Sequence, residues 1–452
     1  MNYKILSIIF LSIFIGIAVP ISIENIFSLF SLTISMCLIL FFKKKSKTWF
    51  NSATFILVIY IVGYLVRYYY LVKVENKVFL PESDIFKSLV ISFLAVIICI
   101  LGIYVSKLKK PNLNLNVQLN DKQTKILLIV SGIFNVTNVI ILILFFGGID
   151  NFFGLLSNRT KNFEGLNWIF SGISCMVMAS LIVYGLNPQY ARKKIFKVYT
   201  LIGFLFLFFT GSRILMLLSL MNFLVISEYV RKKRIKLSKI IAVTLSFLVF
   251  YMAYFIIFRT YLPTGSWDYF NANSKELLIN TVMNGGTGFL DGLVVVTSYM
   301  PYPVELLYGS TFLGVITMLI PRAIFPEKYP LGSAVYNYLF NSDQYSSGTG
   351  QNPTLMGEFY MNFGFLGLFV CMFLFGISLG FLEMWKEEGI KNKTLVPAII
   401  YSLIFPSILL YMKSGLGTAT FYRLLFPFML NFVIVILLNK GKIYLLRGKY
   451  NG

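Results

Sequence analysis

Long apolar segments follow one another along this chain, and many windows longer than about 18 residues contain almost no charge. A segment of about 20 apolar residues crosses the hydrocarbon core of a bilayer as a helix, whereas the strands of a membrane β-barrel alternate and contain only about 10 residues. Charged residues make up 13% of the chain, which is roughly half of their share in soluble domains. The sequence therefore predicts an all-α polytopic membrane protein.

The hydropathy pattern predicts about twelve transmembrane helices. The first resembles a signal peptide, but it lacks a clear small-x-small cleavage site, so we interpret it as an uncleaved span. The predicted spans cover residues 4–21, 25–42, 52–72, 86–106, 126–146, 167–185, 196–211, 213–229, 240–258, 364–385, 395–412 and 424–439.

Basic residues concentrate in alternate connecting segments. The formal net charge is +22, and the rule that cytoplasmic loops are rich in lysine and arginine places these segments and both termini in the cytoplasm. This inner-face charge favours contact with anionic membrane lipid. It is not evidence for nucleic-acid binding, because no basic stripe lies on a soluble domain. The basic segments contain Lys43–Lys47, Lys107–Lys125, Arg192–Lys197, Arg231–Lys239, Lys386–Lys393 and Lys440–Lys449.

One large loop, Arg259–Phe363, lies on the opposite face by this rule and is therefore predicted to be extracytoplasmic. It contains two apolar runs, Gly288–Met300 and Ser310–Pro321, which are too short to span a bilayer and are typical of interfacial or re-entrant helices. We interpret residues 1–452 as a single integral membrane domain, with residues 259–363 as a loop between spans nine and ten.

The residue inventory narrows the chemistry. The chain has no histidine, which argues against Ser-His hydrolases and histidine-ligated metals. Its four cysteines lie in apolar runs and are interpreted as small core residues. The pair Glu82-x-Asp84 is too small a ligand set for a convincing metal site. We expect neither a metal nor a cofactor.

Several arginines are placed at the outer face by the predicted topology. The planar guanidinium binds phosphate oxygens in pairs and stays charged at any working pH, so the group fits a diphosphate-bearing ligand. The alternative is that each arginine extends from a helix end to a lipid headgroup. Arg213 differs from the others because it lies in the turn between two short helices. The set is Arg159, Arg213, Arg259, Arg322 and Arg423.

Glu358 is the carboxylate that we select as a candidate general base, because it lies where the large loop meets span ten, beside Tyr360 and Asn362. The alternative is a structural charge at the start of a helix, where a carboxylate interacts favourably with the helix dipole. The many aromatic residues of the loop suit either stacking on sugars or an interfacial belt.

Three segments carry a resemblance to a known family. Thr210-Gly211-Ser212-Arg213, the segment Ile320–Lys328 with its Pro-Arg-x-x-Phe-Pro pattern, and Gly357-Glu358-x-Tyr360-x-Asn362-Phe363-Gly364 are similar to motifs of the Wzy-type polymerases of O-antigen and capsule repeat units. With the spans and the large loop, the resemblance covers essentially the whole chain.

The resemblance implies a GT-C-like membrane fold and a glycosyltransferase. Such an enzyme transfers a growing glycan from undecaprenyl diphosphate to the next lipid-linked repeat unit at the outer side of the bacterial cytoplasmic membrane, without a metal and with inversion. Glu358 and Arg213 would then be catalytic. The diphosphate and glycan would be bound by Arg159, Arg259, Arg322, Arg423, Tyr360 and Asn362. A chain-length regulator and a flippase of the same pathway are the implied protein partners.

Other functions remain open from the sequence. A flippase of lipid-linked oligosaccharide would suit twelve spans and outer cations, although flippases usually have short loops and charges within several spans. A GT-C glycan ligase would share the chemistry and differ in its acceptor. A structural scaffold of envelope assembly is a third alternative.

Overall fold

The structure is a computed structural model of the full chain. It describes residues 22–72, 80–106, 115–148, 151–152, 167–210, 212–255, 288–317, 325–342, 351–416, 419–439 and 444–445. The regular structure of these residues is helical, apart from one short antiparallel pair in which β1 (Leu115–Asn116) faces β2 (Tyr444–Leu445). The all-α class predicted from the sequence is confirmed for the described residues.

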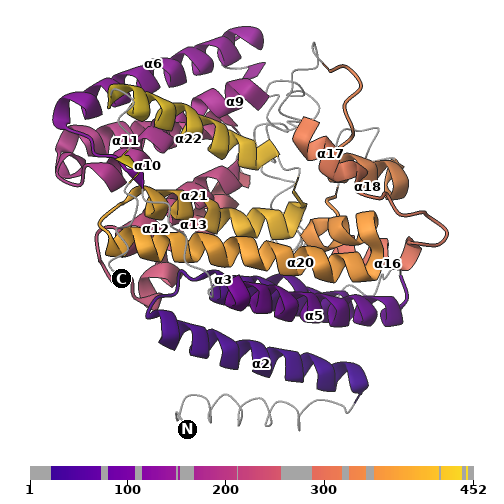
Figure 1. The fold of residues 1–452 in the computed structure, drawn as a ribbon. Helices are drawn as coiled ribbons and strands as arrows, with labels where there is room; N and C mark the ends of the chain where they lie inside the picture. Colours follow the sequence, from indigo (N-terminus) through magenta and orange to yellow (C-terminus); the bar gives the residue numbers. More distant parts are fainter. Residues whose placement is uncertain are drawn as a thin grey trace. The chain divides into compact units, whose positions relative to one another are not determined.

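The helices follow the predicted spans closely (Figure 1). Within the described residues, every predicted span after the first coincides with one helix or with consecutive helical elements, and residues 4–21 lie outside the described residues. The elements are α2 (Ile23–Ser46), α3 (Ser52–Ile59), the π-helical η1 (Tyr60–Leu65), α4 (Val66–Tyr70), α5 (Glu82–Ser106), α6 (Asp121–Phe145), α9 (Asn167–Ile173), α10 (Cys175–Leu186), η4 (Tyr190–Arg192), α11 (Lys194–Phe206), η5 (Leu207–Thr210), α12 (Arg213–Tyr229), α13 (Leu237–Phe255), α16 (Leu290–Tyr299), α17 (Ser310–Thr317), α18 (Gly332–Phe340), α20 (Thr354–Lys391), α21 (Val396–Ser414) and α22 (Ala419–Leu438).

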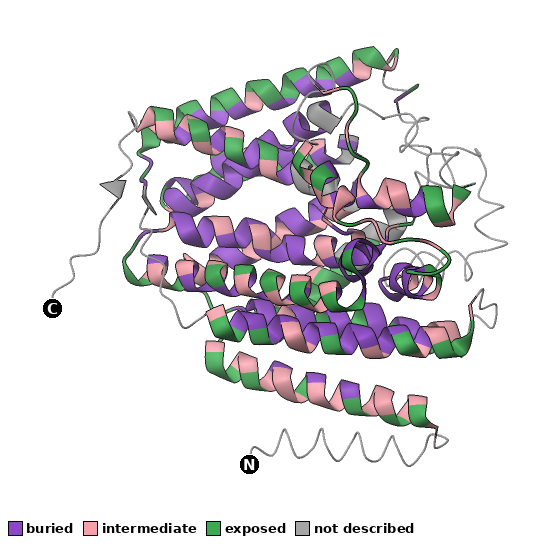
Figure 2. Cartoon of the chain, turned by 45° about the vertical axis from the view of Figure 1, so that its right-hand side comes forward, coloured by how far each residue is buried: buried purple, intermediate pink, exposed green. Residues whose placement is uncertain are grey.

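Six helices within the described part of the chain are long and apolar enough to cross a membrane, and shorter apolar helices accompany them. Their outward faces are apolar, as the exposed positions along α6 illustrate (green in Figure 2). On that helix Ile129 is 61% exposed, Ile133 63% and Leu144 72%. Continuous apolar surface of this kind is rare on a soluble protein. The chain is a polytopic membrane protein, and apolar faces of this kind suit contact with lipid.

The chain forms two compact units. Unit 1 contains Met1–Lys109, Leu278–Phe381 and Ile408–Gly417, and unit 2 contains Lys110–Leu277, Leu382–Ser407 and Thr418–Gly452.

In unit 1, α2 packs on α3, and α3 and η1 pack on α5. Two glycines bring α5 and α20 close together. A Cβ atom at Gly102 would collide with the backbone of Phe373, and one at Gly376 would collide with the backbone of Cys99. Small residues at such crossings let membrane helices approach closely, so that dispersion contacts hold them together.

The helix α20 is broken at Gly364, where the backbone has φ 67° and ψ −162°. This conformation is accessible to glycine and strained for a residue with a Cβ atom. Every residue from Pro353 to Asn362 is buried. The break therefore separates a short buried helical segment from the apolar part of α20 that follows.

In unit 2, α10 is the central helix. It packs against α6, α11, α12 and α22, and all of its residues except Tyr184 are buried. Hydrogen bonds between helices supplement this packing. The Asn431 amide donates to the carbonyl oxygen of Cys175 at 3.2 Å, and the hydroxyl of Ser131 donates to Asn431 Oδ1 at 2.5 Å. Such bonds stabilise helix contacts in lipid because no water competes for the polar groups.

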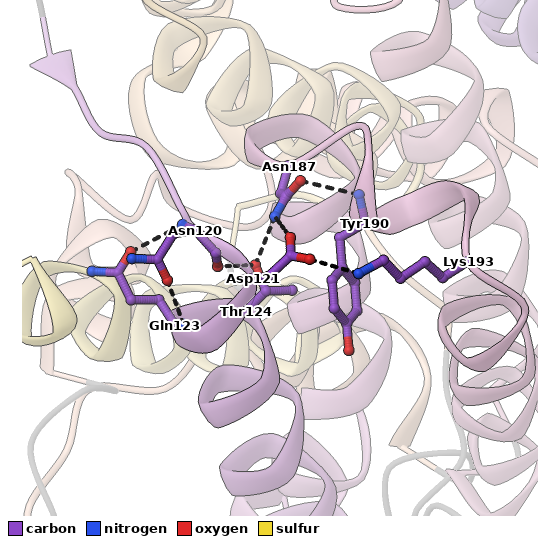
Figure 3. Close-up of polar contacts among 7 residues, drawn as sticks. All are labelled: Asn120, Asp121, Gln123, Thr124, Asn187, Tyr190 and Lys193. Atoms are coloured by element: carbon purple, nitrogen blue, oxygen red, sulfur yellow. Dashed lines mark hydrogen bonds and ion pairs between the residues drawn. The ribbon is translucent and has the colours of Figure 1, made fainter.

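Two features of unit 2 lie at helix ends. The predicted meeting point of spans seven and eight is confirmed: η5 ends at Thr210, α12 begins at Arg213, and the Ser212 N–H donates to the Thr210 hydroxyl at 3.2 Å. Elsewhere, Asp121 at the start of α6 accepts from Lys193 at 2.6 Å and from Asn187 at 3.1 Å (Figure 3). This second cluster fixes the connection between α10 and α11 to α6.

The two apolar runs of the large loop are helical, as predicted. The first forms α16 and the second forms α17. Their interfacial or re-entrant placement stays a prediction.

A buried ion pair fixes α16 to the third span. Arg67 Nε lies 2.8 Å from Asp291 Oδ1, and Arg67 Nη2 lies 2.7 Å from Asp291 Oδ2. The Arg67 side chain is 5% exposed and the Asp291 side chain is 24% exposed. The arginine also lies over the ring of Tyr70 at 5.2 Å. Two parallel charge-assisted hydrogen bonds make this contact directional as well as strong.

We predict that Arg67→Ala lowers the free energy of unfolding by about 3 kcal/mol, because it leaves the partly buried Asp291 carboxylate without its counter-ion. The double variant Arg67→Ala/Asp291→Ala should lose less than the sum of the two single variants. Thermal unfolding of the purified protein measures this coupling. The exposed pair Asp121–Lys193 is the matched control, and Lys193→Ala should change the unfolding temperature little. Additive effects at Arg67 and Asp291 would contradict the prediction.

Candidate functional site

The candidate site lies in unit 1, around the buried segment that precedes the break in α20. Thr354 begins the helix, and its hydroxyl accepts the N–H of Gly357 at 3.2 Å. The next residue, Glu358, is 1% exposed. The sequence predicted a carboxylate at the junction of loop and span, and the structure places it inside the protein.

Both carboxylate oxygens of Glu358 have protein partners. Oε2 accepts the backbone N–H of Leu416 at 2.6 Å, and Oε1 accepts the hydroxyl of Thr311 at 3.1 Å. Thr311 lies on α17, and Leu416 lies just beyond α21. One side chain thus joins three segments that are far apart in the sequence. Hydrogen bonds to a buried carboxylate satisfy a group that would otherwise be costly to remove from water.

Asn362, one turn after Glu358, supports the same arrangement. Its amide nitrogen donates to the Thr311 hydroxyl oxygen at 2.7 Å and to the carbonyl oxygen of Glu358 at 2.7 Å. Because the Thr311 oxygen accepts from Asn362, its own hydrogen is free to point at the carboxylate. Asn362 is fully buried, and these hydrogen bonds join it to other groups inside the protein.

Two glycines leave the space that the carboxylate occupies. A Cβ atom at Gly332, the first residue of α18, would collide with Oε1 of Glu358. A Cβ atom at Gly415 would collide with Oε2, and Gly415 also has φ +80°. The carboxylate therefore fits between the backbone at Gly332 and the backbone at Gly415, because neither residue has a side chain there.

Aromatic and backbone contacts fix α17 and the chain before it against the same segment. The ring of Phe312 stacks on Phe359 with 5.8 Å between centroids. The Leu307 N–H donates to the carbonyl oxygen of Met361 at 2.9 Å. The Tyr360 hydroxyl donates to the carbonyl oxygen of Met300 at 3.4 Å. Tyr360 is buried as well, and its hydroxyl is directed at protein backbone.

The structure describes only some of the arginines that were predicted to bind the diphosphate or glycan. Arg423 is on α22 in unit 2, where it is 8% exposed and its Cζ lies 4.8 Å from the centre of the Phe170 ring. This is a cation–π contact in a desolvated environment. Arg213 is the first residue of α12, and its side chain lies outside what the structure describes. Arg159, Arg259 and Arg322 also lie outside the described residues, so convergence of these arginines stays a prediction.

The sequence did not predict Thr311 as a partner of Glu358, and it did not predict the pairing of Arg67 with Asp291. Thr311 is a small polar residue in an apolar run, and nothing in its spacing points to Glu358. Arg67 and Asp291 did carry a signal, because a charge within an apolar segment requires a partner, but the sequence does not say which charges meet. Among the residues that the structure describes, no group of three or more acidic or cysteine side chains lies together.

Comparison with known proteins identifies the family. The family described as O-antigen polysaccharide polymerase Wzy matches residues 3–442. No curated protein and no solved structure matches the chain. The resemblance seen in the motifs around Arg213, Arg322 and Glu358 is confirmed over nearly the whole length: the chain belongs to the O-antigen polysaccharide polymerase Wzy family, and it polymerises lipid-linked repeat units.

Proposed function

We propose that this polymerase transfers the growing glycan from an undecaprenyl diphosphate carrier to the sugar end of the next lipid-linked repeat unit, at the outer face of the cytoplasmic membrane. Membership in the polymerase family supports the reaction, and the distribution of basic residues supports the orientation. In this proposal both termini are cytoplasmic, the fold is GT-C-like with about twelve crossings, and residues 259–363 form the extracytoplasmic loop of one membrane domain.

The observation that carries the proposed site is the buried carboxylate of Glu358, held by groups from α17 and from the end of α21. A sugar hydroxyl must lose a proton to become a good nucleophile, and a carboxylate is a suitable base in a chain without histidine. Of its two contacts, the 3.1 Å bond from Thr311 is the longer. We propose that the acceptor hydroxyl takes the place of Thr311 at Oε1.

The proposed reaction is one displacement. The acceptor oxygen forms a bond to the anomeric carbon of the donor, its proton passes to Glu358, and the bond from the anomeric carbon to the diphosphate oxygen breaks. The carrier leaves with the bonding electron pair, and the anomeric centre is inverted. Burial favours this chemistry because fixed hydrogen bonds replace mobile water around the reacting groups.

Arginines are proposed to stabilise the negative charge that develops on the leaving diphosphate. Arg213 has this role directly, and Arg159, Arg259, Arg322 and Arg423 bind the diphosphate or the glycan. The burial of Arg423 over Phe170 supports its part in the proposal, since a desolvated cation interacts strongly with phosphate. Because arginines carry this charge, the proposed reaction uses no metal.

Tyr360 and Asn362 have an indirect role in this proposal. Both side chains bind protein groups, Met300 for Tyr360 and Thr311 for Asn362. They would hold the acceptor side of the site in shape while Glu358 and Thr311 exchange partners.

Deletion of the gene that encodes this chain, followed by glycan analysis, tests the proposed polymerase function. We expect single repeat units on lipid or at the surface and no long chains, because export continues when polymerisation stops. Complementation with the wild-type chain is the control. Accumulation of lipid-linked units on the cytoplasmic face would instead indicate a flippase.

Substitution of Glu358 tests the base. Glu358→Gln keeps the size and most hydrogen bonds of the side chain but removes the basic oxygen, so we expect normal abundance and a loss of polymerisation of about 10²-fold or more. Thr311→Val should retain the protein and reduce the rate less. Gel analysis of polymer and immunoblotting of the tagged protein are the measurements. Wild-type polymer in Glu358→Gln together with lost abundance in Glu358→Ala would assign the residue a structural role only.

Substitution of Arg423 tests the proposal that arginines bind the diphosphate of the carrier. Arg423→Ala should reduce the rate of polymerisation by about 10²-fold, and Arg423→Lys should recover only part of it, because lysine keeps the charge and loses the planar fork. Arg213→Ala and Arg322→Ala should also abolish long chains. The control is Arg234→Ala, which removes an exposed arginine from a basic segment. Unchanged chain length in any of these site variants, at normal membrane levels, would remove that arginine from the site.

A further inference from the structure

The segment after α12 in unit 2 places an arginine in an unusual position. The helix ends with a turn in which Lys232 has φ +52° and the Lys233 N–H donates to the carbonyl oxygen of Ser227 at 3.2 Å. The nearest carboxylate in the sequence, Glu228, accepts the N–H of Ile235 at 2.6 Å. Glu228, the acidic residue at the end of α12, is therefore already bonded to the backbone of Ile235. Arg231 follows directly after this helix end.

The guanidinium of Arg231 packs on an aromatic ring. Its Cζ lies 3.6 Å from the centre of the Tyr184 ring. Tyr184 is fixed in turn by a 2.7 Å hydrogen bond between its hydroxyl and that of Ser227, and by an edge contact with Phe223 at 5.3 Å between centroids. One flat face of the guanidinium is thus covered by the ring, and its N–H groups point outward from its edges to polar ligands.

One edge of the Arg231 guanidinium has no ligand. Nε and Nη2 are both buried, and neither has a hydrogen-bond partner among the residues that the structure describes. The same chain shows what this edge binds, because Arg67 uses Nε and Nη2 to hold the two oxygens of Asp291. Two parallel N–H groups match a carboxylate or a phosphate, and leaving them without an acceptor is costly.

A second arginine adds positive charge at this place. Burial lowers the pKa of Arg231, the Tyr184 side chain opposes that shift, and the charge of Arg192 lowers the pKa further. Arg192 is exposed at the end of η4. The carboxylate near η4, Asp121, is occupied by Lys193 and Asn187 (Figure 3). Within the described part of the chain, neither arginine forms an ion pair with a carboxylate.

We propose that Arg231 and Arg192 form a binding site for the phosphate group of an anionic phospholipid. The phosphate presents two oxygens to Nε and Nη2 of Arg231, and the flexible Arg192 closes over it from η4. The anion supplies the acceptors that the protein does not, and it offsets the repulsion between the two guanidinium groups.

A lipid is favoured over a dissolved phosphate by the surroundings of the site. The segment belongs to a basic cluster that the charge pattern assigns to the cytoplasmic membrane face. Lys232, Lys233 and Arg234 are exposed beside it, and cations near a bilayer surface attract anionic headgroups. The bound headgroup would join the α10–η4 connection to the end of α12.

The test uses the full-length protein in nanodiscs of phosphatidylcholine, with and without phosphatidylglycerol, and measures the thermal unfolding midpoint and the number of bound lipids by native mass spectrometry. Phosphatidylglycerol should raise the midpoint of the wild type. Its apparent affinity should fall by about tenfold in Arg231→Gln, and also fall in Arg192→Gln. Arg234→Gln removes the same charge from an exposed neighbour that does not bind the phosphate directly, and it should reduce the affinity much less.

Several outcomes would overturn the proposal. Equal losses in Arg231→Gln and Arg234→Gln would show that only the overall charge matters. A full phosphatidylglycerol effect in Arg192→Gln and in Arg231→Lys would remove the two-arginine site, and Arg192→Gln keeps this test valid if Arg231→Gln does not fold. A separate arm adds inorganic phosphate to the phosphatidylcholine nanodiscs. An equal stabilisation there, lost in Arg231→Gln, would assign the site to a dissolved phosphate instead of a lipid.

Discussion

The absence of water around membrane-spanning helices is the constraint on which the rest of this structure depends. A polar group that is buried away from water within the helices is costly unless it finds a partner. The chain meets this demand in several ways, with Asn431 on the carbonyl of Cys175, Arg67 on Asp291, and Lys386 between the rings of Tyr229 and Tyr401 at 3.8 and 4.3 Å. Because such partners are few and directional, they fix which helices can be neighbours, while the apolar contacts set only how closely the helices approach.

The Glu358 cluster follows from the same constraint. A carboxylate that is 1% exposed persists only where hydrogen bonds compensate for the loss of hydration. Its donors come from α17 and from the residue after Gly415, so the large loop and the end of α21 are held at one point. The Glu358 carboxylate depends on hydrogen bonds from two separate segments, α17 and the residue after α21. A substrate that displaced Thr311 would loosen the contact with α17. In the proposed mechanism, substrate binding and local rearrangement would be coupled through Glu358.

Hydropathy predicted most of the helices, and the reason is physical. A bilayer imposes a minimum apolar length on each span, and this length is visible in one sequence without any knowledge of neighbours. The turn between Thr210 and Arg213 was predictable for the same reason, because two short apolar segments had to fit between basic clusters. The interruptions were not predictable. The π-helical stretch Tyr60–Leu65 and the division of the sixth span at Ser174 depend on local packing.

The candidate site was predictable as a list of residues and not as an arrangement. Glu358 carries a signal because a carboxylate beside a span is unusual. Its partners Thr311, Gly332 and Leu416 carry none, since a threonine, a glycine and a backbone N–H occur everywhere. Contacts between residues distant in the sequence follow from the tertiary fold, which periodicity does not encode. The pairing of Arg67 with Asp291 belongs to the same class, because each charge was visible and the partnership was not.

The break at Gly364 lets the two segments of α20 meet separate requirements. The apolar part of α20 packs against α5 at Gly102, and the part before the break carries Glu358. In an unbroken helix, any rotation that suited the bilayer would turn the carboxylate by the same angle, since the positions of side chains around a helix are rigidly linked. With a glycine at the joint, the membrane segment can change its sequence, tilt or rotation while the direction of the carboxylate is kept.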